Sequence, residues 1–134
     1  MMGLSNGVDI VENKRFSKSI KNINFINRVF SKKEIDLSSK YKNKTNYYAK
    51  RFAAKEAFYK ALGTGIRNGY SFKDVSIKND KYGKPLININ NKIKKMIYKK
   101  FRVKKFKIHL SLSDEKKHSI AFVILEKFWL WNGL

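Results

Sequence analysis

The sequence predicts an α+β protein in which an antiparallel sheet packs on one long helix. The first observation is an Ala-rich segment with helical spacing, from about Thr45 to Leu62. The second is the alternation of apolar and polar residues with a period of two in most of the segments that follow it. The third is the order of the elements along the chain, which is one strand, then helices, then mostly strands.

The N-terminal strand is expected at "GVDIV", residues 7–11. A period of two places Val8 and Ile10 on one face and Asp9 with Val11 on the other. Aspartate is depleted in strands, so Asp9 is either a solvated residue on an outer face or a residue with a function.

Three helical segments are expected before the remaining strands. Apolar residues recur at helical spacing from residue 13 to residue 30, which predicts one helix there. Ser31 followed by Glu34 matches a capping box, so a short helix is expected to begin at this point. The long Ala-rich helix should end at Gly63, since glycine adopts the left-handed cap conformation most readily.

In the C-terminal half, "FKIHLSLSDE" alternates cleanly, whereas "SIAFVILE" is nearly continuous in apolar residues, as in a central buried strand. One helix with an apolar face interrupts the strands. The expected elements are strands at 72–80, 86–90, 106–115 and 119–126, a turn at 80–85 and a helix at 91–101.

The length and composition indicate one domain, residues 1–134, with a C-terminal tail from about residue 127. Hydrophobic residues make up 43% of the chain, enough for a packed core. Because there is no cysteine, disulfides, thiolate metal sites and cysteine nucleophiles are excluded. The sequence shows no signal peptide and no apolar run that could span a membrane, so a cytoplasmic protein is expected.

The net charge is +21, from 31 basic and 10 acidic residues. Such a charge favours a polyanionic partner: a nucleic acid, an anionic lipid, a phosphate-rich ligand or an acidic protein. The alternative is that many lysines are solvated surface residues without a partner, since Lys, Asn and Ile are abundant throughout the chain.

The long helix contains an acid and a base one turn apart, Glu56 and Lys60, while Arg51 and Lys55 form its opposite edge. An ordinary surface pair of Glu56 with Lys60 would stabilise the helix by about 0.3–0.5 kcal/mol. The small alanines nearby let another backbone approach closely, which favours a crevice at Glu56. If Asp9 also reached this crevice, the two carboxylates would suit Mg²⁺, which binds one or two carboxylates together with phosphates and waters.

Two further motifs have simple structural explanations. Gly-Thr-Gly at residues 63–65 is a plain helix cap or a place where backbone approaches a ligand. His109, Ser111 and Ser113 share one face of a strand, which is usually a solvent-facing arrangement. A Ser/His/Asp hydrolase is disfavoured because the sequence has no nucleophile-elbow motif.

Taken together and in this order, "GVDIVE..RF", "RFAAKEAFYKALGTGIRNG", "F.DVSIKND..GKPLI" and "HLSLSDE..HSIAFVILE" resemble the holo-[acyl-carrier-protein] synthase family, the small bacterial-type 4′-phosphopantetheinyl transferases. The resemblance extends from Gly7 to about Glu126. It implies the fold of that family and a homotrimer with active sites at subunit interfaces. It also implies transfer of 4′-phosphopantetheine from coenzyme A to a serine hydroxyl of apo-acyl carrier protein, with release of adenosine 3′,5′-bisphosphate, in support of fatty acid biosynthesis.

The resemblance also implies roles for individual residues. Asp9 and Glu56 resemble the Mg²⁺ ligands of the family, and Lys60 completes the catalytic group as a phosphate contact. The acidic carrier protein is expected to dock on the first helix, mainly through Arg15, with three more basic candidates. The further coenzyme A contacts are Arg51, Gly63, Gly65, Lys84, Pro85 and His109, and the further carrier contacts are Lys18, Lys21 and Arg28.

The chain departs from many family members in its last motif, which ends in Ser-Asp at Asp114 instead of Ser-His. The aromatic C-terminal "FWLWNGL" is either a surface that packs on the trimer or a frayed tail. Two other functions stay open. A basic nucleic-acid-binding protein would explain the charge but neither Asp9 nor Glu56, and a scaffold that keeps only the fold would have no need of Lys60.

Overall fold

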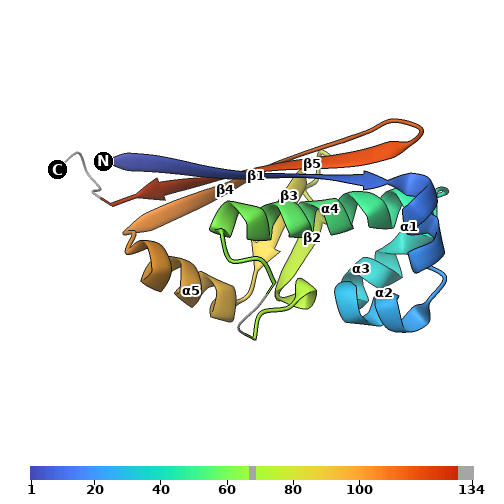
Figure 1. Ribbon diagram of the computed structural model, residues 1–134, viewed down its shortest axis with the longest axis horizontal. Coiled ribbons are helices and arrows are strands. Elements are labelled where there is room, and N and C mark those ends of the chain that lie inside the picture. Colours follow the sequence, from blue (N-terminus) through green and yellow to red (C-terminus); the bar gives the residue numbers. More distant parts are fainter. Residues whose placement is uncertain (67–68, 130–134) are drawn as a thin grey trace.

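The computed structural model describes residues 1–66 and 69–129, and its elements follow the expected order (Figure 1). Two short 3₁₀ turns, η1 (Ser38–Lys40) and η2 (Phe72–Asp74), flank the long helix α4. The helices and strands are β1 (Met2–Glu12), α1 (Asn13–Ser19), α2 (Ile23–Val29), α3 (Lys32–Leu37), α4 (Lys44–Leu62), β2 (Val75–Asn79), β3 (Pro85–Ile89), α5 (Asn91–Phe101), β4 (Lys105–Asp114) and β5 (His118–Phe128).

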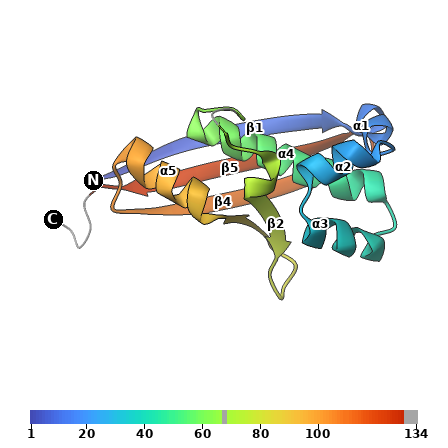
Figure 2. The same cartoon turned by 90° about the horizontal axis from the view of Figure 1, so that it is seen from below.

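Three long antiparallel strands form the main sheet in the order β1-β5-β4, and β2 with β3 forms a separate antiparallel hairpin. The helix α4 lies along one face of the main sheet, with α1–α3 at one end of the molecule and α5 at the other, beside the N-terminus (Figures 1 and 2). The predicted α+β fold is confirmed. The strand β5 is central in the sheet, as its apolar run indicated.

The single helix expected at residues 13–30 is wrong, because two helices, α1 and α2, occupy this range and are separated at Asn22. The side-chain oxygen of Asn22 accepts hydrogen bonds from the backbone N–H groups of Asn24 (2.9 Å) and Phe25 (3.3 Å). Asparagine favours such a cap over a helix interior, since its side chain replaces the missing backbone acceptor. The apolar spacing therefore continues across a break in the backbone helix.

The predicted start of the short helix at Ser31 and the predicted end of the long helix at Gly63 are both confirmed. The hydroxyl of Ser31 accepts from the N–H of Glu34 (3.1 Å), and the Glu34 carboxylate accepts from the N–H of Ser31 (2.9 Å). Gly63 ends α4 in the left-handed conformation, with φ of 75°. The first strand is longer than expected, because it pairs with β5 along its whole length, from Met2 to Glu12.

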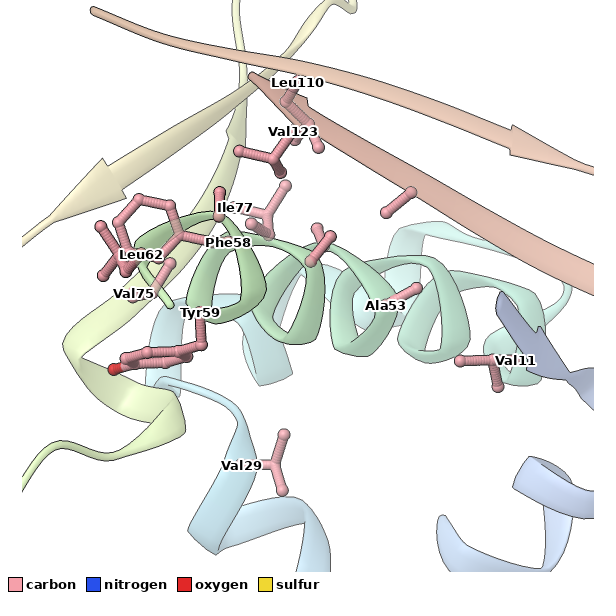
Figure 3. Packing of buried hydrophobic residues seen from close by; sticks show 14 of the residues in the cluster. Val11, Val29, Ala53, Phe58, Tyr59, Leu62, Val75, Ile77, Leu110 and Val123 are labelled. Carbon is pink, nitrogen blue, oxygen red and sulfur yellow. The ribbon is translucent and has the colours of Figure 1, made fainter. Parts of the chain in front are cut away.

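The core surrounds α4, with Leu110 and Val123 of the main sheet on one side of the helix and Val29 on the other (Figure 3). Alanines on α4, including Ala53 and Ala57, are completely buried there. The strand β1 approaches α4 so closely that a Cβ atom at Gly7 would lie 2.0 Å from the carbonyl oxygen of Ala57. No side chain fits at Gly7, so this glycine is required by the contact between strand and helix.

The opposite face of the main sheet is left open by the described elements of this chain. Val8, Ile10 and Phe122 lie on it and are 53%, 60% and 41% exposed. The alternation along β1 turns Asp9 and Val11 toward α4 instead. The alternative that Asp9 is a solvated residue on the outer face is therefore wrong.

The C-terminal aromatic segment begins with Phe128, which ends β5, and Trp129. The indole N–H of Trp129 donates to the carbonyl oxygen of Phe101 (2.7 Å), and its ring lies against Gly3. Residues 130–134 lie outside the described residues, so the two predictions for the tail stay predictions. Among the described helices, none has both the length and the apolar character that a membrane crossing requires.

Candidate active site

A groove of about 400 Å³ opens between β1, α1 and α4, and the carboxylates of Asp9 and Glu56 both line it. Arg15 lines the same groove from α1. Its apolar wall consists of three phenylalanine rings with centroids between 5.1 and 6.0 Å apart. These rings belong to Phe16, Phe25 and Phe52.

The position of Asp9 follows from the glycine two residues before it. Gly7 and Asp9 share one face of β1, and this face is pressed against α4 because Gly7 has no side chain. Glu56 stands on α4 between buried neighbours such as Ala57. The crevice that the alanines predicted at Glu56 is present, and Asp9 is the residue that reaches it.

Lys60 joins the same site through β1. Its Nζ atom donates to Oδ1 of Asp9 (3.0 Å) and to the carbonyl oxygen of Val8 (2.9 Å). The pair that forms is therefore Lys60 with Asp9, and not the intrahelical pair of Lys60 with Glu56 that spacing suggested. The contact across elements is possible because β1 runs directly over this turn of α4.

The two carboxylates interact unfavourably in the groove. Burial raises the pKa of Glu56, the carboxylate of Asp9 raises it further, and Lys60 acts in the opposite direction. Two such groups repel each other unless a cation lies nearby. Asp9 and Glu56 thus form an oxygen donor pair that fits a hard divalent cation such as Mg²⁺, with waters and phosphates as its other ligands. Within residues 1–66 and 69–129, no group of three or more His, Cys, Asp or Glu side chains offers a larger metal site.

Arg51 lies in a second cavity of about 370 Å³, which Pro85 also lines. Helical spacing placed Arg51 on the edge of α4 opposite Glu56, and in the structure only 5% of this residue is exposed. The guanidinium donates to the carbonyl of Tyr47 (3.0 Å) and to Oδ1 of Asn79 (3.2 Å), and stacks 3.6 Å from the Tyr47 ring centroid. Its Nε atom has no hydrogen-bond partner among the described residues. Arg51 nevertheless lines the cavity, and a guanidinium in such a position is suited to bind an anion.

A third cavity of about 240 Å³ adjoins the second one at Pro85. Lys84 and His109 line it, and Nε2 of His109 lies 2.6 Å from a carboxylate oxygen of Glu126. The lysine enters from the turn before β3 and the histidine from the outer face of β4.

The predicted coenzyme A contacts are thus spread over several parts of one chain. Lys60 contacts Asp9, which lines the groove, and Arg51 belongs to the second cavity. Gly63 and Gly65 follow α4 with φ values of 75° and 62°, so both use a conformation that favours glycine. The groove and the two cavities are lined by separate sets of residues, apart from the Pro85 that the cavities share.

The four predicted carrier-protein contacts are all exposed at the end of the molecule that bears the groove. Arg15 borders the groove itself, and Lys18 belongs to the last turn of α1. Lys21 lies in the break between α1 and α2. The guanidinium of Arg28 lies 5.7 Å from the ring centroid of Phe25, which fixes it on the surface of α2.

Two features were missed by reasoning on the sequence. Asp114 ties the end of β4 to α4, since it accepts from the side chain of Asn46 (2.7 Å) and pairs with Lys50 (3.5 Å). Lys55, expected at a helix edge, is completely buried and pairs with Glu34. The capping box explained Glu34 locally, but no pattern linked it to a lysine on another helix.

Comparison with known proteins identifies the family. The model of the 4′-phosphopantetheinyl transferase superfamily matches residues 5–123. A holo-[acyl-carrier-protein] synthase of Pelagibacter ubique is 58% identical over 121 residues, which covers 90% of this chain and 94% of that protein. One from Zymomonas mobilis is 49% identical over 104 residues, 76% of this chain and 78% of that protein.

Solved structures agree with this result. The holo-[acyl-carrier-protein] synthase of Neisseria meningitidis superimposes with a TM-score of 0.80 at 37% identity, covering 92% of this chain and 98% of that one. A Bacillus anthracis enzyme in complex with CoA (3′,5′-ADP) gives 0.78 at 33% identity, covering 95% and 99%. The chain, with Asp9 and Glu56 both lining its groove, belongs to the holo-[acyl-carrier-protein] synthases of the 4′-phosphopantetheinyl transferase superfamily.

Proposed function

We propose that this chain transfers the 4′-phosphopantetheine group from coenzyme A to a serine hydroxyl of apo-acyl carrier protein in a Mg²⁺-dependent reaction. Adenosine 3′,5′-bisphosphate is the second product, and the reaction supports fatty acid biosynthesis in the cytoplasm. One observation carries the proposal: the carboxylates of Asp9 and Glu56 line one open groove, with Lys60 bound to Asp9. The whole chain, residues 1–134, acts in this proposal as one phosphopantetheinyl transferase domain.

In this proposal Asp9 and Glu56 would hold Mg²⁺, and the ion would supply positive charge for the phosphoryl oxygens and for the leaving bisphosphate. Lys60 supplies a second positive charge. Its ammonium group, which donates to Asp9 in this structure, can also donate to a phosphate oxygen. Glu56 accepts the serine proton through a water. The remaining work is positioning, since phosphoryl transfer needs no covalent help from the protein.

We also propose a homotrimer in which a neighbouring chain completes each site. The open sheet face exposes Val8, Ile10 and Phe122, and a partner would remove this apolar surface from water. The anion-binding candidates Arg51 and His109 lie in cavities separate from the groove of their own chain. In a trimer, the Arg51 and His109 of one chain could therefore lie beside the groove of its neighbour. Light scattering after size-exclusion chromatography tests this: a monomer at micromolar concentration would contradict it.

The acidic carrier protein docks, in this proposal, on α1 and α2 beside the groove. Arg15 is the main contact because it borders both the groove and the open surface. Charges at the rim of an interface mainly raise the association rate, so carrier binding should weaken as salt increases.

The first experiment is intact-mass spectrometry of apo-acyl carrier protein after incubation with this protein, coenzyme A and Mg²⁺. We expect a mass gain of one phosphopantetheine arm, and none in a matched reaction with EDTA. No gain with a folded protein and a competent carrier would overturn the proposed activity. A gain that persists in EDTA would overturn the role of the metal alone.

A further inference from the structure

An ion pair that takes no part in the proposed chemistry is sealed inside the molecule. Glu34 is 2% exposed and Lys55 is completely buried, and Nζ of Lys55 lies 2.7 Å from Oε1 of Glu34. Burying two charges is expensive, and replacing such a pair by apolar residues of similar volume is often neutral or stabilising. Stability therefore does not explain why the pair is present.

The pair connects three segments that are distant in sequence. Oε1 of Glu34 accepts from the N–H of Ser31, between α2 and α3 (2.9 Å), and Oε2 accepts from the N–H of Ile77 in β2 (3.0 Å). Lys55, on α4, also donates to the carbonyl of Val29 at the end of α2 (2.8 Å). Each of these bonds has a direction as well as a length, so together they fix how α2, α4 and β2 lie relative to one another.

These three segments carry different parts of the proposed site. The segment α1–α2 bears Arg15 and Arg28, which face the carrier protein. The strand β2 ends at Asn79, which binds the guanidinium of Arg51, and leads into the turn with Lys84. The helix α4 presents Glu56, the residue directly after Lys55, to the groove. The buried Glu34–Lys55 pair therefore connects the proposed carrier-docking helices, the proposed coenzyme A contacts near β2, and α4, which carries the proposed metal ligand Glu56.

We propose that the Glu34–Lys55 pair is a positioning device that holds the carrier-docking helices and the β2–β3 hairpin in register with Glu56. Phosphoryl transfer depends strongly on the placement of its reactants, and an error of about 1 Å can lower the rate by on the order of 100-fold. Apolar contacts alone would let these elements slide over one another, because they have no direction. The inference rests on the proposed function.

The test is the double variant Glu34→Gln/Lys55→Met, which removes both charges and leaves none unpaired. We expect a folded protein whose KM values for carrier protein and for coenzyme A both rise by at least about tenfold. The matched control is Asp74→Asn/Lys92→Met, which changes the charge equally at a pair (3.4 Å) that water reaches, with the lysine side chain 50% and the aspartate side chain 12% exposed. Its KM values should stay within about twofold of wild type, since ion pairs that water reaches contribute little.

A second variant, Glu34→Asp, keeps the charge on Lys55 paired but is one methylene too short to reach both Lys55 and Ile77. We expect its KM for coenzyme A to rise more than its KM for the carrier, and amide exchange of β2 to quicken while that of α4 stays unchanged. Folded variants with both KM values within about twofold of wild type would overturn the positioning role. If wild type itself transfers nothing, the proposed function fails, and unchanged exchange in β2 would separately overturn the inference.

Discussion

Residues 55 and 56 are neighbours on α4, yet their charges have opposite surroundings. Lys55 is sealed from water, and both its partners, Glu34 and the carbonyl of Val29, are acceptors at hydrogen-bond distance. Glu56 is half-buried in an open groove and faces another carboxylate, that of Asp9. A buried charge that is paired with opposite charge holds the structure in place, whereas two neighbouring carboxylates without a cation form a site that favours binding one. Four predictions test this difference between the two charges.

The largest effect is expected for Lys55→Met alone, because it leaves the carboxylate of Glu34 buried without its cation. We expect the free energy of unfolding to fall by about 3–5 kcal/mol. Equilibrium urea denaturation measures the loss, and adding Glu34→Gln to the variant should recover most of it. A loss below about 1 kcal/mol would show that the Lys55 surroundings are not those of a sealed pair.

The next effect is expected at the groove, where Glu56→Gln removes one of the two opposed carboxylates. Turnover should fall by about 100- to 1,000-fold, since a metal ion supplies several kcal/mol of transition-state stabilisation. The folded state should be retained, because Glu56 is only half-buried and glutamine has nearly the same size. The mass-spectrometric transfer assay measures the rate, with circular dichroism as the control, and turnover near the wild-type level would exclude Glu56 as a metal ligand.

A smaller effect is expected for Gly7→Ala, which tests how the two carboxylates are brought together. The added Cβ would lie 2.0 Å from the carbonyl oxygen of Ala57, so β1 must move away from α4. We expect a loss of about 1–3 kcal/mol in stability, with Mg²⁺ binding weakened because Asp9 moves with the strand. Thermal unfolding and titration calorimetry measure the two effects. Unchanged Mg²⁺ affinity in a destabilised variant would separate the strand contact from the metal site.

The smallest effect is the pH dependence of the metal-free protein. Because the pKa of Glu56 is raised on folding, the folded state binds more protons than the unfolded state between the two pKa values. The stability contributed by this group therefore rises as pH falls through its folded pKa. Glu56→Gln should unfold about 2–4 °C higher than wild type at pH 7 without metal, and this advantage should shrink toward acidic pH.

Added Mg²⁺ gives the control for this last comparison, since it should stabilise wild type and leave Glu56→Gln unchanged. Thermal scans from pH 5 to pH 8, with and without Mg²⁺, measure both effects. A Glu56→Gln variant that unfolds below wild type throughout the metal-free series would show that Glu56 stabilises the fold, and the contrast with Lys55 would disappear.

Much of the fold and part of the site follow from the sequence by itself. The long helix, its end at Gly63 and the capping box at Ser31 depend on residues within one or two turns. The alternation in β4 likewise fixes which residues share a face. Such patterns are local, so their period is visible in the sequence. Asp9 and Glu56 stood out because acids interrupted apolar elements, although their roles came from a resemblance to the family.

What spacing could not give are the contacts between elements. The helical wheel placed Lys60 beside Glu56, but β1 supplies Asp9 at 3.0 Å. The same wheel placed Lys55 at an edge, whereas Lys55 is completely buried and donates to Val29 of α2 and to Glu34 of α3. A residue's face is set by the local period, but what covers that face is set by packing between distant segments. The tertiary structure therefore decided that Lys55 is buried in an ion pair between distant segments, whereas Glu56, the next residue on α4, stays open to a ligand.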